Sequence, residues 1–549
     1  MQPNTAESVF LIHSPKQIKI AIVVLLLIAS AIASSGNISL PLDAHETFVV
    51  QTTQEMHDRG DWIIPYFNKQ PRLNKPPLNY WLTGVTAWIT DSLNNIQPWH
   101  GRFVSVIAAL GLVIFTLLIC IKLYERKIAY YSSIMLVTSL GFFDYSHDAR
   151  PDMLYSMFCV AGITAFIYAW KSSYSAKSIL YSYLMWVAYA LATLTKGPQI
   201  PAMFIISSLI FSRSIKLTWQ QTFSLIRPVT GFILYTIIAA PWWILVNNEL
   251  GGAGLQGTQL AGSLLTIKFS NLFNFYYFYR PLVLIVPWVL FMPHAIVNFS
   301  HDKKHRSANM LMALLILIPA ILLSFGSQER WFYMLPSMIP MIILLATGAY
   351  LLSEQIYHNM GHRWFKLIFL SLMVVPASII VAIFYTGNIS GTFNLIMFII
   401  VLIFLFGLLI WTINNKDKSL ISQFMISGLA YTILFIVIGI TNAGWSKDRF
   451  ENYKLAIHAH DVIGNQPIYT VGVTPDVYVY YTSTGINIEN NLTNVINKFR
   501  NSSQNNLFII THEKFINSIP DDIKYTILHK TRAQEHKNIY LVRFEKQAS

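Results

Sequence analysis

Two acidic side chains and a lysine stand out in the first polar stretch of the chain. Asp43 and Glu46 lie three residues apart after the first long apolar segment, and Lys75 follows about thirty residues later, before Pro76-Pro77. An acid can act as a general base, and a lysine on a proline-restricted backbone can bind a phosphate. Beside a bilayer, this combination predicts chemistry on a lipid-linked anion.

The same residues also have structural interpretations, which the sequence leaves open. Asp43 is a good N-cap for a helix that starts after it, and Glu46 is a typical first-turn acid. Lys75 can place its amine at a membrane surface without a specific ligand, and Arg72 is its less specific neighbour. The proline pair favours a fixed position for Lys75.

A second group of charges, the sequence His-Asp-Ala-Arg-Pro-Asp at 147–152, lies where one apolar segment ends and the next begins. Charges at that depth are costly unless they are paired or face a wet cavity. Pairing of Arg150 with Asp148 or Asp152 would join helix ends, and we weigh it equally with a catalytic role. Lys196 is a lone cation between two apolar segments, which favours a phosphate ligand.

Two arginines lie beside aromatic residues. Arg280 follows the aromatic run 273–279, and Arg330 precedes Trp331-Phe332-Tyr333. Arginine suits phosphate because its donors pair with two oxygens. Such aromatic residues form an interfacial belt more often than a platform for stacking sugars.

Motifs of several enzyme classes are absent from the sequence. It contains no Walker loop, dinucleotide-binding glycine motif, paired-histidine zinc motif or nucleophile elbow, so ATP hydrolysis, hydride transfer and zinc hydrolysis have no support. Its two cysteines, Cys120 and Cys159, both lie in apolar segments, which argues against a disulfide framework or a thiolate metal site.

These residues must be positioned by helices in a membrane. Of the 549 residues, 54% are hydrophobic and only 12% are charged, which is typical of a polytopic membrane protein. About thirteen apolar segments are long enough to cross a bilayer as helices. They cover residues 18–35, 102–121, 128–143, 153–170, 179–194, 198–211, 223–246, 281–298, 310–325, 331–352, 365–385, 393–411 and 421–440.

Basic residues in the short loops fall on one side of these segments, and short basic loops stay in the cytoplasm. The net charge of +13 therefore indicates topology rather than a nucleic-acid partner. The opposite side receives all the acid-base groups described above. These outer loops are 43–81, 144–152, 195–198, 247–280 and 326–330, together with the residues after 441.

The outer parts of the chain carry their own secondary structure. In the first outer loop, 46–59 and 77–89 are predicted helices, the second with an apolar face that suits the membrane interface. The composition changes after residue 440, where short β-branched or aromatic runs alternate with turn residues and one predicted helix, 491–500. The predicted strands are 468–473, 477–481, 507–511, 525–529 and 539–544.

We therefore predict two domains. Residues 1–440 form a transmembrane domain that includes a periplasmic first loop at 36–100. Residues 441–549 form a small periplasmic α/β domain.

Several short motifs occur together in one order along the chain. They are Gly60-Asp61-Trp62-Ile63-Ile64-Pro65, Asn74-Lys75-Pro76-Pro77-Leu78-Asn79-Tyr80-Trp81, Arg150-Pro151-Asp152, Thr195-Lys196-Gly197-Pro198 and Arg330-Trp331-Phe332-Tyr333-Met334-Leu335-Pro336. In these motifs and in Asp43, the chain resembles the bacterial aminoarabinose (4-amino-4-deoxy-L-arabinose) lipid A transferases and their protein-O-mannosyltransferase relatives of the GT-C class. One departure is clear. The family usually has an adjacent Asp-Glu pair, whereas Ala44 follows Asp43 here and the next acid is Glu46.

The resemblance implies a GT-C fold and a multi-pass enzyme of the bacterial inner membrane with its active site and C-terminus in the periplasm. It implies a glycosyltransferase that takes a sugar from an undecaprenyl-phosphate carrier and passes it to lipid A, lipopolysaccharide or another envelope acceptor. The partners are then this donor, the acceptor and membrane lipids, without nucleic acid. No cofactor or metal site is required, although a divalent cation is left open.

Carried over by position, the resemblance assigns roles to residues of this sequence. The catalytic candidates are Asp43, Glu46 and Asp152. The carrier-phosphate candidates are Lys75, Lys196, Arg280 and Tyr333. Further cavity candidates are Arg72, Asp148, Arg150 and Arg330.

Three other functions were weighed. A protein O-mannosyltransferase-like enzyme would use the same donor chemistry with a protein hydroxyl as acceptor. A lipid-linked glycan transporter explains the cations but not an acidic loop and a folded tail on one face, since transporters more often place ionisable groups near the midplane. A structural scaffold leaves the buried charges unexplained.

Overall fold

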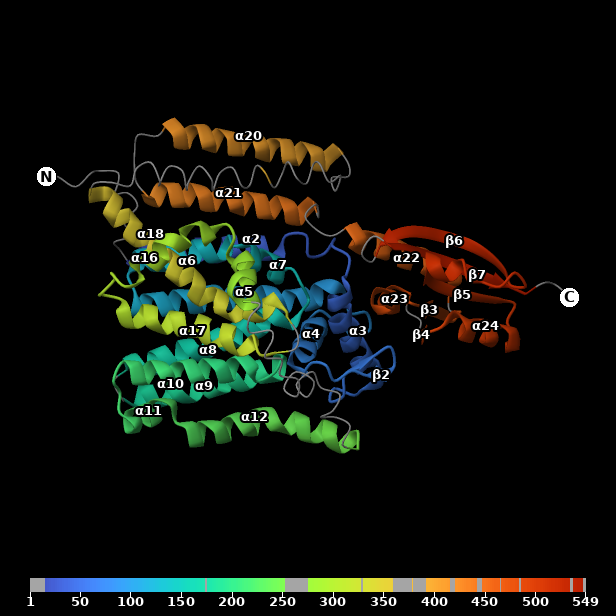
Figure 1. Ribbon diagram of the computed structural model, residues 1–549, viewed down its shortest axis with the longest axis horizontal. Helices are drawn as coiled ribbons and strands as arrows, with labels where there is room; N and C mark the ends of the chain where they lie inside the picture. Colours follow the sequence, from blue (N-terminus) through green and yellow to red (C-terminus); the bar gives the residue numbers. More distant parts are fainter. Residues whose placement is uncertain are drawn as a thin grey trace. The chain divides into compact units, whose positions relative to one another are not determined.

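The structure is a computed structural model of the chain, shown in Figure 1. It describes residues 15–172, 175–251, 275–326, 329–358, 378, 392–414, 420–441, 447–464, 466–482, 485–533 and 537–546. The chain divides into two compact units. Unit 1 contains residues 1–37, 73–79 and 102–443, and unit 2 contains residues 38–72, 80–101 and 444–549.

Unit 1 is helical. Its elements are α2 (Pro15–Ser34), α5 (Pro98–Leu123), α6 (Arg126–Val137), α7 (Leu140–Ser146), α8 (Pro151–Lys171), α9 (Ala176–Thr195), α10 (Gln199–Ser214), α11 (Trp219–Ile226), α12 (Pro228–Glu249), α15 (Tyr276–Tyr279), η2 (Arg280–Ile285), η3 (Trp288–Phe291), α16 (Met292–Phe299), α17 (Arg306–Leu323), η4 (Trp331–Ser337), α18 (Met338–His358), α20 (Thr392–Asn414) and α21 (Leu420–Thr441). Neighbours in the bundle include α8 with α9, α9 with α12, and α10 with α17 (Figure 1).

Six helices of the described part are long and apolar enough to cross a membrane. They are Pro98–Leu123, Pro151–Lys171, Ala176–Thr195, Trp219–Glu249, Arg306–Leu323 and Trp331–Leu352. A bent pair, Tyr276–Ile285 with Trp288–Phe299, is a seventh candidate. The chain is therefore a multi-pass α-helical membrane protein. Apart from residue 378, the predicted span 365–385 lies outside the described residues, and the count of about thirteen stays a prediction.

Two predicted spans are broken in the structure. Residues 128–143 were expected to form one helix, but α6 ends before Thr138, and Ser139 caps α7 by accepting a hydrogen bond from the Phe142 amide (3.4 Å). A serine hydroxyl at this point competes with continuation of the helix. The predicted span 281–298 is bent by 114° between its two halves.

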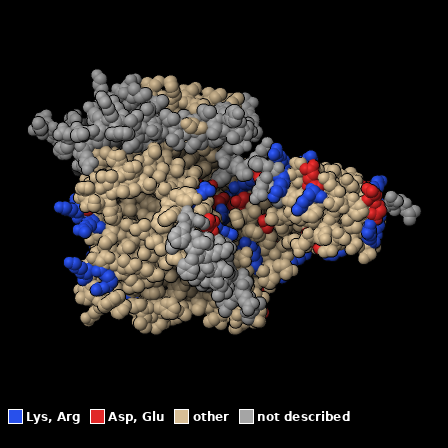
Figure 2. All heavy atoms as spheres, viewed as in Figure 1, with Lys and Arg blue, Asp and Glu red and all other residues tan. Residues whose placement is uncertain are grey.

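The surface of unit 1 fits a lipid environment. Figure 2 shows few charges along the sides of the helices and a concentration of Lys and Arg at one end, near the turns before α17 and between α10 and α11. On α12, Ile233, Ile237 and Ile244 are each more than half exposed. Exposed apolar residues in this number favour contact with acyl chains over contact with water.

Unit 2 combines the first loop with the C-terminal part of the chain. Its elements are α3 (Ala44–Arg59), β1 (Tyr66–Phe67), β2 (Gln70–Pro71), α4 (Leu78–Ile89), α22 (Lys447–Ile463), β3 (Ile468–Val471), α23 (Asp476–Tyr481), β4 (Ile486–Glu489), α24 (Leu492–Asn501), β5 (Asn506–His512), α25 (Glu513–Ile516), β6 (Lys524–Ala533) and β7 (Lys537–Glu545). The sheet order is β4-β3-β5-β7-β6, with β3 parallel to β4 and β5, and β7 antiparallel to β5 and β6.

Alternation along the strands gives this sheet two apolar faces. Phe508 and Ile510 of β5 face a cluster that includes Leu455 of α22, whereas Leu507 and Ile509 face a cluster with residues of α24. Helices therefore cover both faces of the sheet, as the predicted α/β composition requires.

One predicted strand, 477–481, is wrong. This segment belongs to α23 and connects the parallel strands β3 and β4, which need a crossover rather than a hairpin. The prediction failed because valine and tyrosine alternate in this segment, which is a pattern typical of a strand. The predicted helices 46–59, 77–89 and 491–500 are confirmed as α3, α4 and α24 within a few residues.

The first loop packs on the C-terminal part of the chain. Phe67 belongs to the α22 cluster, and Asn68 exchanges hydrogen bonds with the backbone of Ile486 in both directions (2.8 and 3.0 Å). The predicted boundary at 440/441 lies close to Gly444, where unit 2 resumes, whereas most of the loop at 36–100 groups with unit 2. Burial of Phe67 explains this grouping, because its ring needs the apolar face that α22 supplies.

Candidate active site

Asp152 of unit 1 is placed by the start of α8. Pro151 occupies the first turn, and Arg150 before it is extended (φ −115°, ψ 153°), as expected for a residue that precedes proline. Asp152 lies in the first turn, where the amide dipoles favour a negative charge. Its side chain is only 4% exposed, so its charge needs partners within the protein.

Lys196 supplies one partner from the turn between α9 and α10. It is the C-cap of α9, and Gly197 after it has φ of +135°, which an L side chain rarely adopts. The Lys196 amine lies 2.5 Å from Asp152 Oδ1. The amine also faces the rings of Phe332 and Tyr333, at 5.1 and 4.5 Å from their centroids. A buried cation is thus held by one carboxylate and by aromatic faces.

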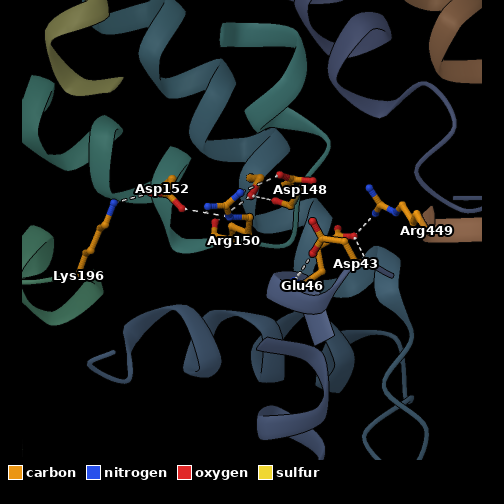
Figure 3. Close-up of polar contacts among 8 residues, drawn as sticks. Asp43, Glu46, Asp148, Arg150, Asp152, Lys196 and Arg449 are labelled. Carbon is orange, nitrogen blue, oxygen red and sulfur yellow. Dashed lines mark hydrogen bonds and ion pairs between the residues drawn. The ribbon is translucent and has the colours of Figure 1, made fainter. Parts of the chain in front are cut away.

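Arg150 extends this pairing. Its guanidinium lies 3.4 Å from Asp152 and 3.6 Å from Asp148, and it stacks against Phe332 at 5.0 Å. Figure 3 shows the resulting chain, Lys196 to Asp152 to Arg150 to Asp148, which we call the unit 1 charge cluster. Both ion pairs weighed from the sequence are therefore present. Two cations and two carboxylates balance within this cluster.

The other predicted cations of unit 1 differ in the contacts that they make. Lys75 is half-buried and interacts electrostatically with Asp152. Arg330 interacts with the Tyr333 hydroxyl, and its backbone amide donates to Tyr277 (3.1 Å). Arg280 is exposed at the start of η2, and no contact recorded for the described residues joins it to the cluster.

The acid loop of unit 2, residues 41–46, leads into α3. Asp43 Oδ1 accepts a hydrogen bond from the Glu46 amide (2.7 Å), and Glu46 Oε2 accepts one from the Asp43 amide (3.2 Å). This reciprocal pair is a capping box, so the N-cap interpretation of Asp43 is confirmed. Asp43 remains half-buried, which leaves part of its carboxylate accessible.

Glu46 has a partner that sequence reasoning missed. Its side chain is fully buried and forms an ion pair with Arg449 of α22 (Figure 3). Arg449 Nε also donates to the carbonyl of Pro41 (2.5 Å), and the Leu42 amide donates to the Tyr481 hydroxyl (2.9 Å). C-terminal residues therefore hold the acid loop on both sides of Asp43.

Arg72 and Asp476 complete the charges around Asp43 within unit 2. The Arg72 guanidinium lies 4.0 Å from the centroid of the Phe48 ring and donates to the Tyr80 hydroxyl (3.2 Å). The pKa of Asp476 is raised to about 6, mainly by burial; the charge of Arg72 opposes this shift and that of Asp43 adds to it. Asp476 was not predicted as a site residue; it is the first residue of α23, and the rest of that helix, 477–481, was assigned to a strand.

The predicted site residues are thus distributed over both units. Unit 1 holds Lys75, Asp148, Arg150, Asp152, Lys196, Arg280, Arg330 and Tyr333, and unit 2 holds Asp43, Glu46 and Arg72. Sequence reasoning missed Arg449 as the partner of Glu46, Asp476 as a neighbour of Asp43, and Phe332 as a neighbour of Lys196. Among the described residues, no three His, Cys, Asp or Glu side chains are grouped to hold a metal ion.

The chain is similar to known proteins in sequence and in structure. Residues 74–244 match the family model described as dolichyl-phosphate-mannose-protein mannosyltransferase. The chain is 22% identical over 338 residues to an undecaprenyl phosphate-alpha-4-amino-4-deoxy-L-arabinose arabinosyl transferase of Pectobacterium carotovorum, covering 61% of this chain and 60% of that protein. A protein of the same name from Shewanella sediminis is 25% identical over 328 residues, covering 54% of each chain. The alignments thus span little more than half the length of these relatives.

Solved structures extend the similarity to nearly the whole chain. The crystal structure of ArnT from Cupriavidus metallidurans in the apo state matches with a TM-score of 0.71 at 13% identity, covering 96% of this chain and 98% of ArnT. The same protein bound to undecaprenyl phosphate matches with a TM-score of 0.73 at 12% identity and equal coverage. The predicted GT-C fold and the resemblance to aminoarabinose transferases are confirmed.

Proposed function

We propose that this chain, similar in sequence and fold to aminoarabinose transferases, is a glycosyltransferase of the bacterial inner membrane. It takes a sugar from an undecaprenyl-phosphate carrier and transfers it to lipid A, lipopolysaccharide or another envelope acceptor at the periplasmic face. The observation that carries the proposal is the unit 1 charge cluster, in which a buried Lys196 and a half-buried Arg150 lie against aromatic rings and share Asp152. The names of the relatives, which include an undecaprenyl phosphate-linked sugar, support the donor.

The unit 1 charge cluster suits a lipid phosphate because its cations are already in position. Asp152 holds Lys196 and Arg150 in place, so no rearrangement is needed when an anion arrives. Low exposure strengthens each charge interaction relative to water. We assign Lys75 and Tyr333 to the same phosphate, and Arg280 and Arg330 to its periphery, since Arg280 is exposed.

The reaction follows from the chemistry of the donor. The bond between the sugar carbon and a phosphate oxygen breaks, its electron pair stays on the phosphate, and the acceptor oxygen forms the new bond to that carbon. Negative charge therefore grows on the leaving phosphate, where Lys196 and Arg150 stabilise it. Each such group contributes about 10²- to 10³-fold in other enzymes that stabilise a developing anion.

We assign Asp43 to the acceptor. If the acceptor is a hydroxyl, Asp43 removes its proton; if it is a lipid A phosphate, Asp43 orients the acceptor or the sugar. Its N-cap contact uses Oδ1, which is compatible with either role. Glu46 is fully buried in its ion pair with Arg449, so we assign it to holding the acid loop rather than to proton transfer.

We further propose about thirteen spans, with the active site and the C-terminus in the periplasm. The concentration of Lys and Arg at one end of the helices supports this orientation, because short basic loops stay in the cytoplasm (Figure 2). A reporter that is active only in the cytoplasm, fused after Ser549, should be silent. A strong signal would reverse the orientation.

The transfer reaction is tested by mass spectrometry of lipid A, lipopolysaccharide core and envelope proteins from a deletion strain and its complemented parent. Loss of a pentosamine or hexose from a lipid supports the proposal and identifies both substrates. Loss of a hexose from proteins instead would favour the protein O-mannosyltransferase-like alternative, which the family match at 74–244 also supports. Unchanged lipids and proteins would contradict both.

We propose that transfer needs no cofactor, because Lys196 and Arg150 supply fixed positive charge where the phosphate leaves. Activity of the purified chain should persist in EDTA. Loss of activity in EDTA that Mg²⁺ or Mn²⁺ restores would show that a divalent cation takes part.

A further inference from the structure

Unit 2 contains a cavity of about 580 Å³ beside the acid loop. Its walls come from both ends of the chain: the segment before Asp43, one side of α3, the segment before α5, and α22 and α23. The volume lies within the range of about 300 to 1,000 Å³ that is typical of sites for small molecules.

The lining has a distinctive chemistry. Among the residues that the structure describes, the lining contains five carboxamide side chains, three tyrosines and one carboxylate, Asp58, but no lysine or arginine. Carboxamides both donate and accept hydrogen bonds, as the hydroxyl groups of a sugar do. Tyrosine rings offer flat apolar faces to the carbon-bound hydrogens of a sugar ring. The absence of cations from this lining disfavours a phosphate and favours an uncharged or amine-bearing saccharide.

The walls are held in place by the protein itself. Gln54 accepts from the Ile96 amide (2.8 Å) and donates to the Leu93 carbonyl (3.1 Å), which fixes the segment before α5. The Tyr480 hydroxyl donates to the Ile96 carbonyl (3.1 Å). The rings of Tyr453 and Tyr481 meet edge to face at 4.9 Å. A preorganised wall lowers the entropic cost of binding.

The cavity is linked to the acid loop through the backbone. Pro41 lines it and lies two residues before Asp43, and the Leu42 amide is bonded to Tyr481, another lining residue. A ligand in the cavity therefore lies against the segment that positions Asp43.

We propose that this cavity binds sugar rings of the acceptor, and that it does so as a subsite separate from the unit 1 charge cluster. This inference rests on the proposed transfer reaction, in which Asp43 acts on the acceptor. The donor is the less suitable occupant, because its reacting sugar is bonded directly to a phosphate and this lining provides no cation.

The test uses the purified full-length chain with its lipid-linked donor and its acceptor. Tyr453→Ala removes a ring from the cavity wall, and we expect about a tenfold higher KM for the acceptor with an unchanged KM for the donor. Tyr453→Phe keeps the ring and should behave like the wild type. Tyr525→Ala, at an exposed tyrosine of β6 in the same unit, is the matched control and should change neither constant.

Binding of the deacylated acceptor saccharide, measured by calorimetry, tests the cavity without turnover. Binding to the wild type and to Tyr525→Ala, but about tenfold weaker binding to Tyr453→Ala, supports the subsite, provided that the variant unfolds at the wild-type temperature. If Tyr453→Ala is destabilised, Asn95→Ala on the same lining replaces it, with the same expected effect.

The outcomes separate the two proposals. Normal transfer with an unchanged acceptor KM in both Tyr453→Ala and Asn95→Ala would overturn the subsite and leave the transfer reaction standing. Absence of transfer by the wild type would overturn the transfer reaction. The saccharide titration alone would then show whether the cavity binds a sugar. Absence of saccharide binding to the wild type would also overturn the subsite.

Discussion

The two charged regions of this protein bury their charges in different ways. The unit 1 charge cluster is assembled from two turns, one before α8 and one after α9, and its four charges balance within a chain of contacts. In the acid loop of unit 2, the buried carboxylate of Glu46 is paired with Arg449, which lies 403 residues further along the sequence. One region depends on the ends of neighbouring helices and the other on packing between distant segments. Asp152 keeps Arg150 as a partner when Lys196 is replaced, so we expect a substitution of Lys196 to affect chemistry more than folding. A substitution at the buried Glu46–Arg449 pair should affect folding first.

The largest expected effect on chemistry is that of Asp43→Asn. Asparagine caps a helix about as well as aspartate, so thermal stability should be unchanged. The amide can neither accept a proton nor carry charge, so transfer should fall by about 100- to 10,000-fold. The check is a transfer assay with purified donor and acceptor alongside thermal unfolding, with Asp91→Asn at an exposed turn as the matched control. Near-wild-type transfer by Asp43→Asn would show that Asp43 acts only as a helix cap.

Next in size is Lys196→Met, which keeps the length of the side chain and removes its charge. We expect transfer to fall by about 100- to 1,000-fold, since this cation stabilises the leaving phosphate. Lys171→Met, at the other end of α8, provides a matched control that should keep most of its activity. If Lys196→Met loses no more activity than Lys171→Met, Lys196 does not stabilise the leaving phosphate.

Arg449→Met tests the acid loop of unit 2, where we expect an effect on stability. It leaves the Glu46 carboxylate buried without its partner, and breaking such a pair costs about 3 to 5 kcal/mol. Thermal or denaturant unfolding of the purified chain should show this loss, and the double variant Arg449→Met/Glu46→Leu should recover most of it. The exposed pair of Arg500 and Asp522 is the control, because Arg500→Met should cost no more than about 1 kcal/mol. Equal effects at the two pairs would contradict the clamp on the acid loop.

The smallest expected effect is the pH dependence due to Asp476. Its pKa is raised to about 6 in the folded chain, so folding favours the protonated carboxyl and the unfolded chain loses this proton at lower pH. The contribution of Asp476 to stability is therefore complete below about pH 4 and is lost as pH rises to about 6. The Asp476→Asn variant cannot ionise at this position. The difference between its unfolding temperature and that of the wild type should therefore increase, in favour of the variant, between pH 4 and 6 and stay constant above pH 6. A constant difference from pH 4 upward would show that Asp476 titrates normally.

Local features of the fold followed from the sequence. The N-cap at Asp43, the first-turn acid Glu46 and the break between two apolar segments at Gly197 each depend on a few consecutive residues. The pairing of Arg150 with its two neighbouring acids was weighed from the sequence for the same reason. Such features are predictable because the residues that restrict the backbone or cap a helix contact only residues within one or two turns of themselves. Prediction failed at 477–481, where a strand-like alternation was overridden by the need to connect two parallel strands.

What the sequence determined by itself was the class of protein, the apolar helices and the identity of the side chains that carry charge at their ends. Only the tertiary structure decided which of these charges are partners: Arg449 for Glu46, Asp476 as a neighbour of Asp43, and the aromatic face of Phe332 for Lys196. It also decided that the first loop packs with the C-terminal part of the chain and that the two together line an open cavity. The physical reason is that hydropathy and helix periodicity are properties of neighbouring residues. An ion pair across 403 residues forms only when burial of apolar surface elsewhere brings its two segments together.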